Sequence, residues 1–181
     1  PPPTQKLGLA RAPRLINVGP PPPPRGVVFF WGGGAAPPAS RLAAVQALYE
    51  IDRSAASVDE VITAACDQGA VLDESGLSHP ADARLLAAVA RGAMDNREIL
   101  DDLIDEALAS SWTTARLETL MRAVLRAGAG ELLVSSEVPA RVVISDYVDV
   151  AHAFWERGEP GMVNAVLDRL ARHLRAAEFD T

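Results

Sequence analysis

The stretch Leu117–Leu133, with the sequence LETLMRAVLRAGAGELL, indicates the fold class of this chain. Its large apolar residues recur at i, i+3, i+4, i+7 and i+8, which is the spacing of a helix that buries one face. They are Leu117, Leu120, Met121, Val124 and Leu125. The segment therefore predicts a buried amphipathic helix whose start is marked by Trp112-Thr113-Thr114.

Helical spacing continues on both sides of this segment, from Ser40 to Leu174. Two capping-box patterns, Ser57–Glu60 and Asp95–Glu98, predict helix starts, because the first and fourth residues can satisfy each other's backbone amides. Prolines are tolerated in the first turn of a helix. We expect helices to open at Ser40, Val58, His79-Pro80, Asp95, Trp112, Pro139 and beyond Pro160. Seven helices and no strand predict an all-α fold of short-looped bundles.

Residues 1–39 have a different composition from the rest of the chain. They contain 11 of the 14 prolines, including the run Pro20–Pro24, and the triplet Gly32–Gly34. Such a segment cannot build a packed core. We therefore predict a disordered proline- and glycine-rich extension ahead of the helical part.

The charge of the helical part argues against an indiscriminate nucleic-acid binder. Residues 1–39 hold four basic residues and no acid, so residues 40–181 carry 13 arginines against 24 acids, a balance of −11. Indiscriminate binders use a broad basic surface to release counterions from phosphates. Any RNA contact must therefore be local, specific or shared with a basic partner.

Other features of the composition restrict the class of protein. No apolar run approaches the roughly 20 residues that a membrane span needs, and the single cysteine, Cys66, excludes an internal disulfide framework. The histidines His79, His152 and His173 lie far apart and have no ligand at i+4. We expect a cytoplasmic protein that is not an enzyme and has no metal site and no cofactor.

One acidic pattern has three interpretations. Asp101-Asp102-Leu-Ile-Asp105 matches the Asp-Asp-x-x-Asp motif with which isoprenoid synthases hold magnesium and diphosphate. That chemistry needs a second acidic cluster across a deep cavity, which this sequence does not offer. We favour a solvated acidic face of the helix. The second interpretation is a docking face for a basic protein, and the third is a metal site.

Four segments resemble, in order and spacing, the motifs of the NusB family. The last of them, MVNAVLD, is similar to the family's Phe-Val-Asn-Gly-Val-Leu-Asp. The segments are Arg41–Tyr49, Arg122–Leu133, Val138–Phe154 and Met162–Asp168. Together they span residues 40–175, which is almost everything outside the proline-rich extension.

The resemblance implies a seven-helix fold, with a three-helix subdomain over residues 40–95 packed against a four-helix subdomain over residues 96–177. It implies a transcription antitermination factor that binds boxA-type RNA together with the ribosomal protein NusE. Such a factor joins the antitermination complex of RNA polymerase and promotes processive transcription of ribosomal RNA operons. Whether the chain forms a homodimer is left open.

The resemblance assigns RNA contact to Arg41, Gln46, Tyr49, Met162 and Asn164. Arginine offers a fork for phosphate, glutamine a donor and acceptor for a base edge, and tyrosine a stacking face. Three of these residues have structural alternatives: core packing for Tyr49, an exposed polar face for Gln46, and a bond to backbone at a helix start for Asn164.

The sequence also departs from the family pattern. Pro37-Pro38-Ala39 stand where the family has arginines, and Met162 stands where it has an aromatic residue. Gly130 replaces a usual tyrosine and Ala165 a usual glycine. These changes predict weak RNA binding by the chain alone. Two alternatives remain: the NusB-like module of a ribosomal RNA cytosine methyltransferase, and a helical scaffold that binds only protein.

Overall fold

The computed structural model describes residues 39–72, 78–109 and 111–180, and these form seven α-helices and one short hairpin. Their order is α1 (Ala39–Arg53), α2 (Val58–Gln68), β1 (Ala70–Leu72), β2 (Ser78–Pro80), α3 (Ala83–Asp95), α4 (Arg97–Ala107), η1 (Thr114–Arg116), α5 (Thr119–Val134), α6 (Ala140–His152), α7 (Glu159–Leu174) and η2 (Ala176–Glu178). The predicted all-α class with seven helices is confirmed. No helix in these ranges is long and apolar enough to cross a membrane.

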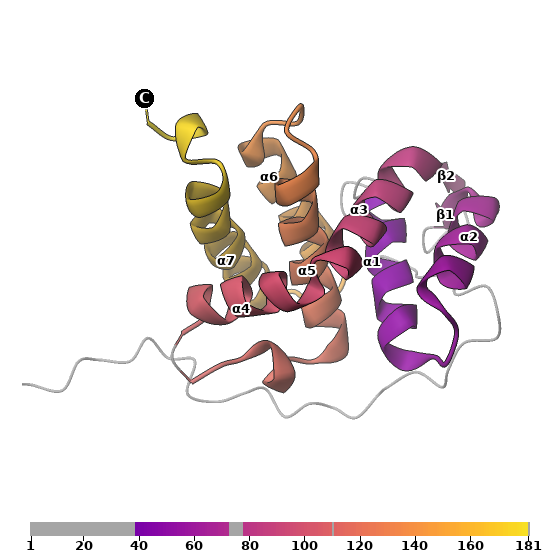
Figure 1. The fold of residues 1–181 in the computed structure, drawn as a ribbon, viewed down its shortest axis with the longest axis horizontal. Coiled ribbons are helices and arrows are strands. Elements are labelled where there is room, and N and C mark those ends of the chain that lie inside the picture. Colours follow the sequence, from indigo (N-terminus) through magenta and orange to yellow (C-terminus); the bar gives the residue numbers. More distant parts are fainter. Residues whose placement is uncertain (1–38, 73–77, 110, 181) are drawn as a thin grey trace, which may run out of the picture.

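Helix α5 lies at the centre of the molecule. In Figure 1 it stands between α1–α3 on one side and α4, α6 and α7 on the other, and it contacts α1, α3, α4, α6 and α7. Every residue from Ala123 to Leu132 is buried. The apolar stripe predicted one buried face, but α5 is buried on all sides here, Arg126 and Glu131 included, because other helices pack around it.

Two glycines allow neighbouring helices to approach α5 closely. A Cβ added at Gly130 would lie 3.0 Å from the backbone Cα and N of Ala93 in α3. A Cβ added at Gly128 would lie 2.7 Å from Leu167 Cδ1 in α7. Since ordinary carbon contacts are about 3.5–4.0 Å, a side chain at Gly130 would push α3 away.

The hairpin between α2 and α3 contradicts two predictions. We expected no strand and a helix that opens at His79-Pro80, but β1 and β2 pair antiparallel, with Val71 opposite His79 and Ala70 opposite Pro80. Helix α2 ends at Gly69, whose φ of 65° turns the chain. Asp82 then caps α3, because its carboxylate accepts hydrogen bonds from the backbone N–H groups of Arg84 and Leu85. Each of the two strands has three residues, which is too few for the sequence to show the alternating pattern of a strand.

Helix boundaries elsewhere agree with the predictions only in part. The Ser57 capping box is confirmed, since Glu60 N donates to Ser57 Oγ at 3.2 Å and Ser57 N to Glu60 Oε2 at 2.8 Å. The expected box at Asp95–Glu98 is wrong: Asp95 ends α3, and Asn96 precedes α4 without a side-chain cap. Trp112 also does not open α5, because η1 intervenes and α5 begins at Thr119.

The described residues share one hydrophobic core. Buried side chains from α1, α3, α5 and α7 belong to the same cluster. Ser40 also joins α1 to the start of α3, because Asp82 N donates to its Oγ at 2.7 Å. The division into subdomains over residues 40–95 and 96–177 stays a prediction, and the expected extension lies outside the described residues apart from Ala39.

Candidate nucleic-acid interface

Arg41, the first residue assigned to RNA, is buried at one end of the α1–α5 interface. Its Nε donates to Glu131 Oε2 at 2.9 Å, and its Nη2 bonds the other oxygen of the same carboxylate. Its Nη1 lies 2.7 Å from Asp146 Oδ2 in α6. Tyr147 donates its hydroxyl to Glu131 Oε2 at 3.0 Å. Arg41 is 8% exposed and Glu131 fully buried, so the arginine fork is occupied within the protein.

The ionisation of this cluster follows from its partners. Burial works to lower the pKa of Arg41, but the hydrogen bond and charge of Glu131, together with Tyr147 and Asp146, raise that pKa above its usual value. Burial, followed by the charge of Glu131, raises the pKa of Tyr147 well above its usual value. Tyr147 is therefore a neutral donor and Arg41 a permanent cation that offsets Glu131.

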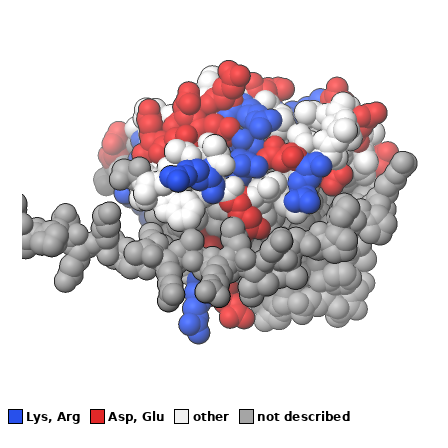
Figure 2. All heavy atoms as spheres, turned by 90° about the horizontal axis from the view of Figure 1, so that it is seen from below, with Lys and Arg blue, Asp and Glu red and all other residues white. Residues whose placement is uncertain are grey.

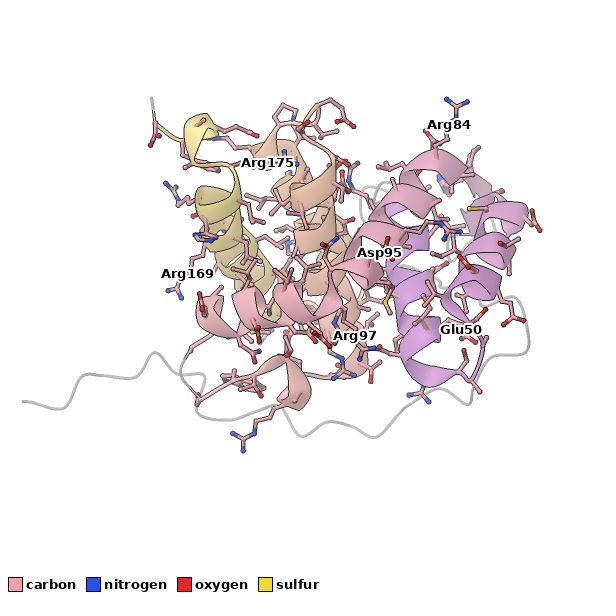
Figure 3. The ribbon with its side chains drawn as sticks, in the orientation of Figure 1. Glu50, Arg84, Asp95, Arg97, Arg169 and Arg175 are labelled. Atoms are coloured by element: carbon pink, nitrogen blue, oxygen red, sulfur yellow. The ribbon has the colours of Figure 1, made fainter. Side chains whose placement is uncertain are left out.

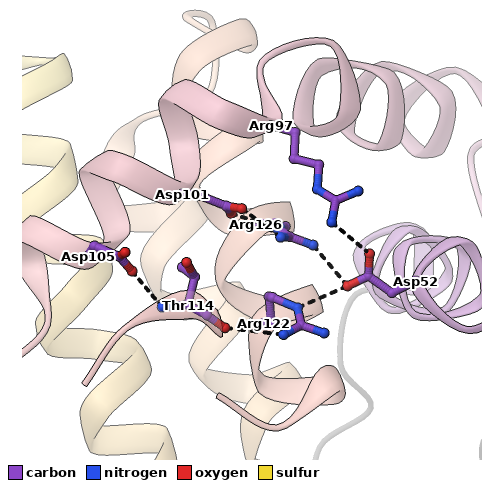
Figure 4. A network of polar contacts seen from close by, with 7 residues as sticks. All are labelled: Asp52, Arg97, Asp101, Asp105, Thr114, Arg122 and Arg126. Carbon is purple, nitrogen blue, oxygen red and sulfur yellow. Dashed lines mark hydrogen bonds and ion pairs between the residues drawn. The ribbon is translucent and has the colours of Figure 1, made fainter. Parts of the chain in front are cut away.

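A second ion-pair cluster lies at the other end of the α1–α5 interface (Figure 4). Asp52 of α1 accepts from Arg126 Nη1 at 2.9 Å and Arg122 Nε at 3.0 Å, and Arg97 Nη2 lies 3.7 Å from it. Arg126 also forms two 2.7 Å bonds with Asp101 of α4. This cluster joins α1, α4 and α5, because one carboxylate serves three guanidinium groups.

The acidic pattern of α4 is only partly the solvated face that we favoured. Asp101 is held by Arg126, and Asp105 accepts a 2.5 Å hydrogen bond from Thr114 N at the start of η1. Asp102 and Glu106 are exposed. Figure 2 shows acidic side chains gathered on one side of the face viewed from below, with arginines beside them. Among the described residues no group of three His, Cys, Asp or Glu side chains is placed to hold a metal ion.

Gln46 and Tyr49 lie three residues apart on α1, within one turn of each other, whereas Arg41 lies more than one turn nearer the start of the helix. Gln46 is half-buried, not part of an exposed polar face, and its Nε2 is buried without a hydrogen-bond partner among the described residues. Tyr49 is half-buried and packs against the core. The Cζ atom of Arg53 lies 5.4 Å from the centroid of its ring. The structure thus places these two side chains beside each other and Arg41 apart from them.

Met162 and Asn164 lie on opposite flanks of the buried face of α7, because residues two apart on a helix point in nearly opposite directions. Met162 is half-buried against the core. Asn164 is exposed, lies five residues inside α7 and faces a groove beside α6. It bonds no backbone group of the described residues, so the expected structural role at a helix start is not seen.

Sequence patterns did not indicate the partners of Arg41 or the groove between α6 and α7. Glu131 offered a signal, because it is the one acid of α5 and lies in a run of apolar residues and glycines, and a buried charge needs a partner. The groove offered none, since its residues come from three elements. Its lining residues are Arg141, Ile144, Ser145, Val148, Asn164, Asp168, Arg172 and Phe179.

The described residues thus form a helical protein whose buried charges are paired between helices and whose surface carries open grooves. The model of the NusB family matches residues 38–172. The transcription antitermination protein NusB of Rhodopseudomonas palustris (strain BisB5) is 49% identical over 142 residues, covering 78% of this chain and 82% of the relative. That of Nitrobacter hamburgensis is 47% identical over 142 residues, covering 78% of this chain and 89% of the relative. The chain belongs to the NusB family.

Solved structures agree with this fold. A NusB structure from T. maritima is 27% identical, with a TM-score of 0.63 over 78% of this chain and 95% of that one. A structure of the antitermination factors NusB and NusE with double-stranded RNA is 22% identical, with a TM-score of 0.59 over 74% of this chain and 94% of that one. At that identity the second likeness concerns the fold alone.

Proposed function

We propose that this chain is a transcription antitermination factor that binds boxA-type RNA together with the ribosomal protein NusE. It would act in the antitermination complex of RNA polymerase on ribosomal RNA operons, in the cytoplasm and without catalysis. The observation that carries this proposal is the 49% identity to a protein named transcription antitermination protein NusB. A solved protein of the same fold binds NusE and double-stranded RNA.

The charges favour shared RNA binding over binding by this chain alone. Residues 40–181 have a balance of −11, and the fork of Arg41 is occupied by Glu131. A basic partner docked on this acidic chain would supply the missing phosphate contacts. RNA would then tighten the protein pair by the same factor as the partner tightens RNA.

For Arg41 itself we propose a positioning role. Its contacts hold the start of α1 against α5 and α6, and so fix the helix that carries Gln46 and Tyr49. Those two residues, with Met162 and Asn164, remain the proposed RNA contacts. Because Met162 stands where the family has an aromatic residue, this chain lacks a base-stacking interaction worth about 1–3 kcal/mol per base.

The test is a titration of labelled boxA RNA with this chain, with and without NusE, against a scrambled RNA of the same length. We expect tighter and sequence-dependent binding when NusE is present. Equal affinity with and without NusE would disprove the cooperative part. No RNA binding in either case would favour the alternative of a protein-only scaffold. The methyltransferase alternative is disfavoured, because the similar proteins are named transcription antitermination protein NusB.

A further inference from the structure

The groove between α6 and α7 has the composition of a polar ligand site. Its volume is about 340 Å³. Two helical stripes face each other across it, and Phe179 stands at one end. The stripes consist of Arg141, Ser145 and Val148 from α6 and of Asn164, Asp168 and Arg172 from α7.

Two guanidinium groups converge on Phe179 at the end of the groove. Arg141 Cζ lies 5.9 Å and Arg172 Cζ 4.8 Å from the centroid of its ring. The negative ring face attracts both cations, and so holds two like charges near each other. Because they come from different helices, α6 and α7 together form this cationic end.

The positive charge there is only partly neutralised. Arg172 donates to Asp168 Oδ2 at 2.8 Å, whereas Arg141 has no ion-pair partner among the described residues. The nearby Glu178 is committed elsewhere: its Oε2 accepts from Ala140 N at 2.7 Å, and its Oε1 lies 3.3 Å from Arg175 Nη1. A helical part that is acidic overall therefore carries a local cationic site at this groove.

The middle of the groove offers polar groups with few apolar ones. Ser145 and Asn164 contribute a hydroxyl and an amide that no described residue bonds. Asn164 and Val148 also line a second hollow further along the same helices, which His152 and Arg157 border. The two hollows thus form one track along α6 and α7.

We propose that RNA continues from the boxA site along this α6–α7 groove, with Arg141 and Arg172 at a backbone phosphate and Ser145 and Asn164 at a base edge. The inference rests on the proposed function and extends it to a second segment of RNA. An amphipathic peptide helix fits the groove less well, because it needs a row of apolar anchors and the groove offers only Ile144 and Val148.

The experiment compares Arg141→Gln with Arg84→Gln in complex with NusE. Arg84 is a matched control, since it is exposed on α3, far from α6 and α7 in Figure 3, and has no partner among the described residues. Affinity is measured for boxA RNA alone and for boxA RNA extended at either end, over a series of salt concentrations. Losing one phosphate contact lowers the slope of log affinity against log salt by about 0.7 for a single strand.

We expect Arg141→Gln to weaken binding of an extended RNA and to lower its salt slope, while Arg84→Gln behaves as the parent. Arg141→Gln should leave the affinity for NusE without RNA unchanged. If the parent binds boxA RNA and the two variants are indistinguishable on every RNA, the groove is not an RNA site, although the proposed function stands. A loss of NusE affinity without RNA would make the groove a protein-docking surface and overturn the inference. A parent that binds no RNA would overturn both proposals.

Discussion

The α1–α5 interface and the α6–α7 groove use the same residue type in opposite ways. At the interface, Arg41 and Arg126 are buried and bond carboxylates of neighbouring helices. At the groove, Arg141 and Arg172 are exposed, and Arg141 has no carboxylate partner among the described residues. An arginine within a family motif is therefore no sign of ligand contact by itself. Its burial and its partners decide whether it holds the fold or remains accessible to a ligand.

The largest expected effect is that of Arg41→Ala on stability. It leaves the fully buried Glu131 carboxylate with only the Tyr147 hydroxyl, and breaking one side of a buried pair costs about 3–5 kcal/mol. Urea denaturation followed by circular dichroism measures the free energy of unfolding. Arg41→Lys should fall between parent and alanine, because lysine keeps the charge but lacks the fork. An exposed ion pair contributes up to about 1 kcal/mol, so a smaller loss for Arg41→Ala would contradict the structural role of Arg41.

A smaller effect is expected for Asp52→Asn at the other end of the interface. Arg126 keeps its two bonds to Asp101, so the loss comes from the charge-assisted bonds to Arg122 and Arg126 and from the longer contact with Arg97. Such bonds contribute about 1.5–3 kcal/mol, which sets the expected loss in the same denaturation experiment. Asp102→Asn is the control, since Asp102 is exposed on α4. If both variants unfold at the parent's midpoint, the cluster of Figure 4 does not contribute to stability.

Replacing Gly130 by valine tests the packing that surrounds both clusters. The new Cβ would stand 3.0 Å from the Ala93 backbone, and overpacking of this kind costs typically about 1–3 kcal/mol. Gly161→Ala is the matched control, because nothing lies within 4 Å of its added Cβ. Melting curves should show a lower midpoint for the first variant only. Equal midpoints would mean that α3 can shift without loss.

The smallest effect on stability is expected at the groove. Arg172→Gln removes an exposed pair with Asp168, and such pairs contribute little because water screens them. The denaturation midpoint should match that of the parent, while the salt slope for extended RNA should fall. A clear drop in stability would place Arg172 with the structural arginines and weaken the contrast between the two regions.

Local sequence patterns determined the helical fold and the family. Apolar spacing at i, i+3 and i+4 and the Ser57 capping box are properties of neighbouring residues, so they indicated seven helices without any knowledge of packing. Short elements escaped this reasoning. The hairpin strands have three residues each, and α3 begins after its cap Asp82 and not at His79-Pro80 as expected.

Only the tertiary structure decided which charged residues are available to a ligand. Arg41 and Glu131 are 90 residues apart in sequence, and helical spacing carries no information on which distant helices meet. Packing also brought Arg141 and Arg172, which come from different helices, to the ring of Phe179. Helix formation depends on contacts within a few residues, whereas the pairing of charges depends on the burial that the whole fold creates.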